Sequence, residues 1–163
     1  MTVVCNATPL INFAAINRLE ILQAMFGQVV IPQAVYNETT GSSLPGSQSV
    51  LEAIASGWLQ VRTVSAIVPE ILAELDDGER QAIALALEIS ESRILLDERE
   101  ARQVAQRLGL QVIGTLGILL LAKDNQVIPQ VQPLLDRIIS MAQYWVAATL
   151  YQQVLRQAGE LVE

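Results

Sequence analysis

Histidine is absent from this 163-residue chain, and that absence excludes several kinds of active site. Without histidine there can be no Ser-His-Asp triad, no Cys-His pair and no histidine-ligated zinc ion. Cys5 is the only cysteine, so an internal disulfide is impossible and a reducing, cytoplasmic compartment is expected. Any hydrolytic chemistry must therefore rest on carboxylates, on a metal ion or on Cys5.

Aromatic side chains are scarce, and long apolar runs are missing. Phe, Trp and Tyr make up 4% of the chain, too few for an extended platform on which single-stranded bases stack. The longest apolar segment, 112–122, contains two glycines and is shorter than the roughly 20 residues of a transmembrane helix. The N-terminus also lacks the basic flank and cleavage site of a signal peptide. We therefore expect no membrane association.

The charge balance is acidic, with a formal net charge of −7. This argues against a long electrostatic grip on nucleic acid, which draws on clusters of Lys and Arg. It does not exclude a small acidic site that holds metal ions. The composition is 52% hydrophobic with a mean hydropathy of +0.38, which is typical of a folded protein with a substantial core.

Short apolar runs alternate with segments of helical periodicity, a pattern typical of a parallel sheet joined by crossover helices. The runs predict strands at 2–5, 28–31, 58–64, 93–96 and 111–113. Helices are predicted at 9–25 (broken near Asn17), 32–38 (with Pro32 in the first turn), 50–56, 69–75, 76–89, 98–108, and from 115 onward with breaks at 125–129 and 142–146. We expect one α/β domain over residues 1–163, with a central parallel sheet of about five strands.

Acidic and amide side chains follow several of the predicted strands. In a parallel sheet the carboxyl ends of the strands share one edge, where ligands bind. Four positions far apart in the sequence are expected there: Asn6, Glu38, the group Asp76, Asp77 and Glu79, and the pair Asp97 and Glu98. Carboxylates and an amide oxygen form an all-oxygen site, which suits Mg²⁺ or Mn²⁺. Such ions support attack of water on a phosphodiester.

Each of these residues also has a purely structural interpretation. Asp76 and Glu79 have the spacing of a capping box at the start of a helix. Asp97 and Glu98 fit N-cap and first-turn positions, and Glu38 fits an exposed helix position. Asn6 fits a turn that leads into Thr8.

Six segments, in order, carry a resemblance to a known family. They are VVCNATPLINF (3–13), GQVVIPQAVYNE (27–38), LDDGERQAIALA (75–86), ILLDEREAR (94–102), LGLQVIGTLGIL (108–119) and LYQQVLRQAGE (150–160). The chain resembles the PIN-domain family, within a prokaryotic, PIN-like branch related to the VapC-type toxins. The resemblance implies a three-layer α/β/α, Rossmann-like sandwich and a metal-dependent ribonuclease. Many such proteins are the toxin of a toxin–antitoxin pair.

The resemblance also implies roles for individual residues. It implies catalytic acids at Glu38, Glu79 and Asp97, and metal ligands at Asn6, Glu38, Glu79 and Asp97, with Asp77 and Glu98 as alternatives for the third and fourth acids. Thr8 matches a nearby hydroxyl residue. Independently of the resemblance, the helical spacing of Arg99 and Arg102 makes them candidates for substrate contact, although an exposed helix face with ion pairs would use the same arginines. The family pattern has aspartate where this chain has Asn6, so the site loses one negative charge, and the resemblance then implies one bound ion rather than two.

Two classes of function follow. One is a Mg²⁺- or Mn²⁺-dependent ribonuclease with RNA as substrate and a small antitoxin protein as partner. The alternative is a catalytically weak or inactive PIN-like module that binds RNA or a protein. A receiver-like signalling domain is disfavoured because the only lysine, Lys123, lies deep in the C-terminal helical run. Apolar residues between 115 and 157 exceed what one sheet face requires, which predicts a homodimer or an antitoxin groove unless they pack in the core.

Overall fold

The computed structural model describes residues 2–41, 43–65 and 72–161. A five-stranded parallel sheet forms its centre, with strand order β3-β2-β1-β4-β5. The strands are β1 (Thr2–Cys5), β2 (Gln28–Pro32), β3 (Leu59–Arg62), β4 (Arg93–Leu95) and β5 (Gln111–Ile113). All five predicted strands are confirmed, although β3 is shorter than expected.

The direction of the crossovers changes between β1 and β4. Val4 lies in register with Val30 of β2 on one side and with Ile94 of β4 on the other. The pairing continues one residue past β1, where the backbone amide of Asn6 donates to the Leu95 carbonyl at 2.9 Å. In open α/β sheets a ligand crevice lies beyond the carboxyl ends at this switch point. Asn6 therefore stands at the place where such a crevice is expected.

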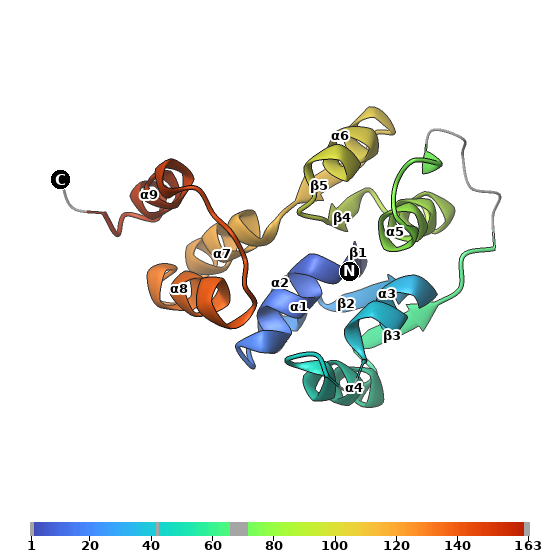
Figure 1. The fold of residues 1–163 in the computed structure, drawn as a ribbon, viewed down its shortest axis with the longest axis horizontal. Coiled ribbons are helices and arrows are strands. Elements are labelled where there is room, and N and C mark those ends of the chain that lie inside the picture. The colour runs from blue at the N-terminus through green and yellow to red at the C-terminus, as the bar shows by residue number, and fades with distance from the viewer. Residues whose placement is uncertain (1, 42, 66–71, 162–163) are drawn as a thin grey trace.

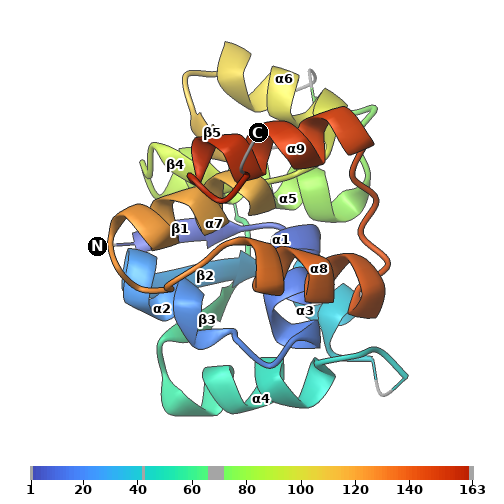
Figure 2. The same ribbon diagram turned by 90° about the vertical axis from the view of Figure 1, so that its left-hand side faces the viewer.

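Helices cover both faces of the sheet (Figure 1). They are α1 (Ala7–Ala15), α2 (Glu20–Phe26), α3 (Gln33–Thr39), α4 (Ser47–Ser56), α5 (Asp77–Glu88), α6 (Arg99–Arg107), α7 (Thr115–Asp124), α8 (Gln132–Met141) and α9 (Ala148–Gln157). Figure 2 shows α7, α8 and α9 in front of the sheet, on the side of α1 and α2. The three-layer α/β/α sandwich is thereby confirmed.

Strand residues alternate between two cores, because successive side chains of a strand point to opposite faces. Val3 and Cys5 pack with helices α1, α2, α7, α8 and α9, whereas Val4 packs with α5 and α6. Both cores are fully apolar at the sheet and include long runs of residues with no exposed surface. The sheet is therefore a rigid platform whose carboxyl edge is the natural place for polar chemistry.

Several helix boundaries were anticipated by local signals. The break near Asn17 is confirmed, since this residue has a φ of +55° between α1 and α2. Gly109 follows α6 with a φ of +85°, as its role as a helix stop requires. Pro32 differs from expectation: it ends β2 in an extended conformation and serves as the N-cap of α3, one residue before the helix. Of the predicted helical turn 69–75, residues 69–71 lie outside the described residues, and residues 72–75 form a short 3₁₀ and turn segment before α5.

Most of the surplus apolar side chains of the C-terminal helices pack in the core. Leu119, Leu134, Leu135 and Ile138 are buried, whereas Met141, Trp145 and Leu150 are exposed. Core packing thus accounts for much of the excess that suggested a protein partner. Within the described ranges, no helix is long and apolar enough to cross a membrane.

Candidate functional site

Asn6 occupies the N-cap position of α1 but does not use its side chain as a cap. Asparagine is among the best N-cap residues because its side-chain oxygen normally accepts from the first turn of the helix. Here the residue is 3% exposed, and Oδ1 is buried with no hydrogen-bond partner among the residues that the structure describes. A buried carbonyl oxygen left unpaired costs about 1–3 kcal/mol. Such an oxygen is available to accept from, or to coordinate, a group that the protein itself does not supply.

Glu98 shows the same pattern at the start of the opposite helix. It is the N-cap of α6 and likewise makes no side-chain cap. Its Oε1 accepts from Asn6 Nδ2 at 3.1 Å, and its Oε2 accepts from Thr8 Oγ1 at 2.5 Å. Asn6 and Thr8, which follow β1, therefore hold the Glu98 carboxylate beside the unpaired Asn6 oxygen.

Glu38, near the end of α3, reaches the same place. A Cβ atom added to Gly78 would collide with Glu38 Oε1 and would lie 3.3 Å from Asn6 Oδ1. The two oxygens thus flank one point, and only glycine leaves the space open. Burial is the main reason that the pKa of Glu38 is raised. The charges of three nearby carboxylates raise that pKa further, those of Asp76, Glu98 and Asp77.

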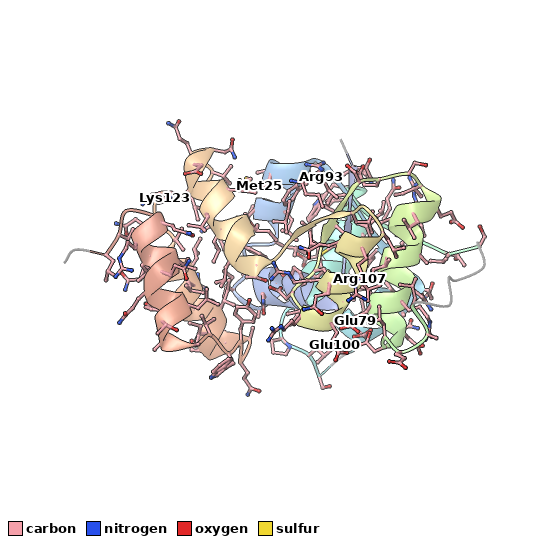
Figure 3. All side chains as sticks on the ribbon, turned by 90° about the horizontal axis from the view of Figure 1, so that it is seen from above. Met25, Glu79, Arg93, Glu100, Arg107 and Lys123 are labelled. Carbon is pink, nitrogen blue, oxygen red and sulfur yellow. The ribbon has the colours of Figure 1, made fainter. Side chains whose placement is uncertain are left out.

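Glu79 takes part in the capping box that its spacing predicts. Its backbone amide donates to Asp76 Oδ1 at 2.8 Å, and its own Oε1 accepts from the Asp76 amide at 3.2 Å. Burial raises the pKa of Glu79, and the charges of Asp76, Glu98 and Glu38 also raise it. The structural interpretation is therefore confirmed, yet Glu79 still shares the electrostatic environment of Glu38 and Glu98. Figure 3 shows it on the α5–α6 side of the molecule, far from Lys123 of α7.

We call Asn6, Thr8, Glu38, Glu79 and Glu98 the acidic cluster. Asp77, the alternative to Glu79, pairs with Arg80 and is mostly exposed. Cys5 is fully buried, and this burial raises the pKa of its thiol, so Cys5 is unsuited to act as a nucleophile.

Asp97 lies in a different network, although it is adjacent to Glu98 in the chain. Its Oδ1 accepts from the Thr115 amide at 2.9 Å and from the Tyr144 hydroxyl at 3.0 Å. Its Oδ2 accepts from Thr115 Oγ1 at 2.6 Å, and that hydroxyl accepts in turn from Asn12 Nδ2 at 3.0 Å. We call Asp97, Thr115, Tyr144 and Asn12 the Asp97 cluster. It joins β4 to α1, to α7 and to the segment before α9.

The acidic cluster fits a divalent cation in its donor types. In the described part of the chain, no three acidic or cysteine side chains stand in a ready-made metal geometry. The cluster instead offers one unpaired amide oxygen together with carboxylates whose charges disfavour one another. An all-oxygen set of this kind suits Mg²⁺ or Mn²⁺. A cation would both occupy the Asn6 oxygen and relieve the repulsion among the acids.

The predicted substrate-binding residues divide between two places. Thr8 orients Glu98, whereas Arg99 and Arg102 lie on α6 beside Asp97 and line a shared hollow. The sequence did not single out Gly78 or Tyr144. The available signal for Gly78 was a glycine inside the acidic motif DDGE. Its missing side chain leaves room for the oxygens of Glu38 and Asn6. No local pattern could have shown that Tyr144 would reach Asp97 from 47 residues away.

An open, doubly wound α/β sheet with a group of acidic and amide side chains at its switch point defines the class of this protein. The chain belongs to the PIN-domain family: the family profile DUF3368, described as a PIN domain, matches residues 2–160. The resemblance found in the sequence is thereby confirmed.

One solved structure illustrates the same architecture. A PilT N-terminus domain protein, SSO1118, from the hyperthermophilic archaeon Sulfolobus solfataricus P2 is similar with a TM-score of 0.54 and 18% identity. The similarity covers 90% of this chain and 98% of that chain. At this identity the likeness bears on the fold alone. No curated protein matches the chain.

Proposed function

We propose that this protein is a Mg²⁺- or Mn²⁺-dependent ribonuclease whose metal centre is the acidic cluster. The observation that carries the proposal is the buried, unpaired Asn6 Oδ1 beside the carboxylates of Glu38 and Glu98. Glu98 takes the role of the fourth acid better than Asp97 does, because the oxygens of Asp97 already accept three hydrogen bonds.

Each residue of the acidic cluster has a separate task in this proposal. Asn6 Oδ1, Glu38 and Glu98 would hold the cation, with Glu79 at its side. When bound, the ion supplies charge stabilisation to a phosphodiester and lowers the pKa of water. Thr8 and the Asn6 amide group fix the orientation of the Glu98 carboxylate. Gly78 leaves open the space between Glu38 and Asn6.

A toxin role with a protein partner is the biological setting that we propose for this activity. The exposed apolar side chains Met141 and Trp145 lie on the C-terminal part of the chain and support a protein-binding surface there. A small antitoxin or a second copy of the chain would cover it. RNA would bind at the carboxyl edge of the sheet.

The test is cleavage of RNA by the purified protein with Mn²⁺, with Mg²⁺ and with EDTA. Glu38→Gln removes a proposed ligand without changing side-chain size, and we expect loss of cleavage by more than about 100-fold. Glu52→Gln is the matched control, because Glu52 is exposed on α4, away from the carboxyl edge. Equal activity of wild type and Glu38→Gln across structured and unstructured RNAs would contradict the proposal.

A second candidate is the inactive PIN-like module, which the uncharged Asn6 favours. The amide donates to Glu98, so the site keeps its shape without a cation. For this candidate, calorimetry would detect Mn²⁺ or RNA binding while no RNA is cleaved under any metal condition.

A further inference from the structure

Among the described residues, the side chains of three arginines of α6 have neither an acidic partner nor a hydrogen bond, whereas Arg62 and Arg137, which also lack an acidic partner, each donate to a neutral oxygen. The chain has ten Lys and Arg residues in total and a net charge of −7. Among the described residues, Arg99, Arg102 and Arg107 make no hydrogen bond or ion pair, whereas Arg18, Arg80, Arg93 and Lys123 each pair with an acid. In a chain so rich in carboxylates, unpaired guanidinium groups concentrated on one helix are unexpected.

The position of Arg99 is unfavourable for the helix itself. It is the first residue of α6, where the helix macrodipole favours negative side chains. Arg102 follows one turn later, so that both guanidinium groups belong to the same side of the helix and line one hollow with Gln103 and Gln106. These cations do not stabilise the helix, which leaves binding of an anion as their use.

A second hollow adjoins the first, and Asp97 and Arg102 line both. It has a volume of about 420 Å³, within the range of small-molecule sites. Its walls are aliphatic, from Leu116 and Leu120 of α7 and from Leu150 and Val154 of α9. Tyr144 closes it on the side of the Asp97 cluster.

The polar groups of this hollow are fixed in place. The Tyr144 hydroxyl donates to Asp97, and Asp97 also accepts twice from Thr115, which is completely buried. Arg102 Nη1 and Asp97 Oδ1 lie 3.7 and 2.9 Å from the point that a Cβ on Gly114 would occupy. The hollow therefore combines an apolar wall, an aromatic ring, a hydrogen-bonding carboxylate and a free guanidinium group.

We propose that this hollow binds one unpaired nucleotide of a single-stranded RNA, with the base against the aliphatic walls and Tyr144 and the phosphate on Arg102 and Arg99. The pocket deepens the proposed function and rests on it, since Asp97 and Glu98 are consecutive and place the hollow next to the acidic cluster. A nucleotide seated there would present its neighbouring phosphodiester to the carboxyl edge. Base edges offer N–H donors, and the Tyr144 hydroxyl oxygen can accept from one of them while its own proton stays on Asp97.

Charge favours a nucleotide over a protein side chain as the occupant. An apolar residue of a partner would fill the walls but would leave the guanidinium of Arg102 without an anion. A single-nucleotide pocket also agrees with the net charge of −7, because it needs two cations rather than an extended basic strip. A folded duplex could not enter, since its bases are paired and stacked.

The experiment measures binding of nucleoside 5′-monophosphates by calorimetry and of a fluorescein-labelled heptanucleotide RNA by anisotropy, in EDTA. Mononucleotides contain no internucleotide bond, so their binding is independent of cleavage. We expect Arg102→Ala to weaken binding at least tenfold and to lower the slope of log K against log salt by about 0.7 for the heptanucleotide. Arg102→Lys should recover part of the loss.

Two further variants distinguish binding in the hollow from a general electrostatic attraction of RNA to α6. Gly117→Leu adds a side chain to the wall where the nearest atom, Ile113 Cγ2, lies 3.4 Å from the new Cβ, and it should weaken binding at least tenfold with no change in charge. Arg107→Ala removes the same charge as Arg102→Ala from a different hollow of α6 and should change binding less than twofold. Figure 3 labels Arg107 on this helix.

The outcomes distinguish this pocket from the nuclease proposal. If Arg102→Ala and Gly117→Leu bind mononucleotides like wild type while remaining folded by circular dichroism, the pocket is wrong. Equal affinity for a duplex of the same length would also overturn it. Nucleotide binding with the expected variant pattern, together with no cleavage under any metal, would support the pocket and overturn the nuclease. Cleavage that depends on Glu38 but not on Arg102 would do the reverse.

Discussion

Asp97 and Glu98 are consecutive carboxylates that serve two contrasting clusters. Asp97 accepts from an amide and two hydroxyls, with a buried threonine and a half-buried tyrosine among its partners. Glu98 accepts two hydrogen bonds from the end of β1 and stands beside an amide oxygen that has no partner at all. The hydrogen bonds of Asp97 all come from the protein, whereas Glu98 belongs to a group of oxygens in which Asn6 Oδ1 has no partner among the described residues. Hydrogen-bond saturation thus separates an acid that joins elements from acids available to a ligand.

The two clusters also differ in what they connect. The Asp97 cluster links α1, β4, α7 and the segment before α9, so it ties the C-terminal helices to the sheet. The acidic cluster gathers side chains from the ends of β1, α3 and β4 with the start of α5. Burial is the main reason that the pKa values of Glu38 and Glu79 are raised, and repulsion among nearby carboxylates raises them further. The first cluster favours the folded state, and the second opposes it unless a cation is bound.

The largest expected effect comes from exchanging each carboxylate for its amide. Glu98→Gln should reduce metal-dependent RNA cleavage by more than about 100-fold, because it removes a proposed ligand charge. Asp97→Asn should lower the free energy of unfolding by about 1–3 kcal/mol, because an amide nitrogen would face donors that now meet a carboxylate oxygen. Urea unfolding and a single-turnover cleavage assay measure the two quantities on the same samples.

The two variants should therefore fail in different assays. Glu98→Gln is expected to unfold within about 1 kcal/mol of wild type, since the new amide oxygen can accept from Asn6 Nδ2 while the Thr8 hydroxyl turns to accept from the new NH₂ group. If Asp97→Asn abolished cleavage while its unfolding and Mn²⁺ affinity matched those of Glu98→Gln, the two acids would have the same role. The separation of the clusters would then be wrong, and the metal site would include Asp97 as the family resemblance implies.

The fold could be predicted closely from the sequence because its signals are local. The strand runs, the break at Asn17 and the stop at Gly109 each depend on a few neighbouring residues. The capping box of Asp76 and Glu79 was visible for the same reason. By contrast, which of Asp97 and Glu98 faces the crevice depends on the direction in which the chain leaves β4. Partners such as Thr8 and Tyr144, 90 and 47 residues away, decide it, and no local periodicity reports them.

A smaller effect is expected from restoring the family's charge at position 6. Asn6→Asp adds a negative charge beside Glu38 and Glu98, which should tighten Mn²⁺ binding about tenfold, or roughly 1.4 kcal/mol, by calorimetry. The same change replaces the Asn6–Glu98 hydrogen bond by repulsion, so the metal-free protein should become less stable. Asn12→Asp is the control, because Asn12 is equally buried but belongs to the Asp97 cluster. Unchanged Mn²⁺ affinity in Asn6→Asp would place position 6 outside the metal site.

The smallest effect concerns the pH dependence of stability without metal. The pKa values of Glu38 and Glu79 are raised in the folded protein above the ordinary value of 4.5, so the folded state binds more protons than the unfolded state. Their contribution to stability is therefore fully present below pH 4.5 and is lost as pH rises through the folded pKa values. Both side chains are partly exposed, so solvent screening keeps the change modest.

In EDTA, the urea midpoint of Glu38→Gln should fall less than that of wild type as pH rises above 4.5. Saturating Mg²⁺ should reverse the wild-type decline, because the cation binds the ionised carboxylates. A midpoint that rose equally in both proteins, with or without Mg²⁺, would show that these acids do not repel one another, and the acidic cluster would then be as satisfied as the Asp97 cluster.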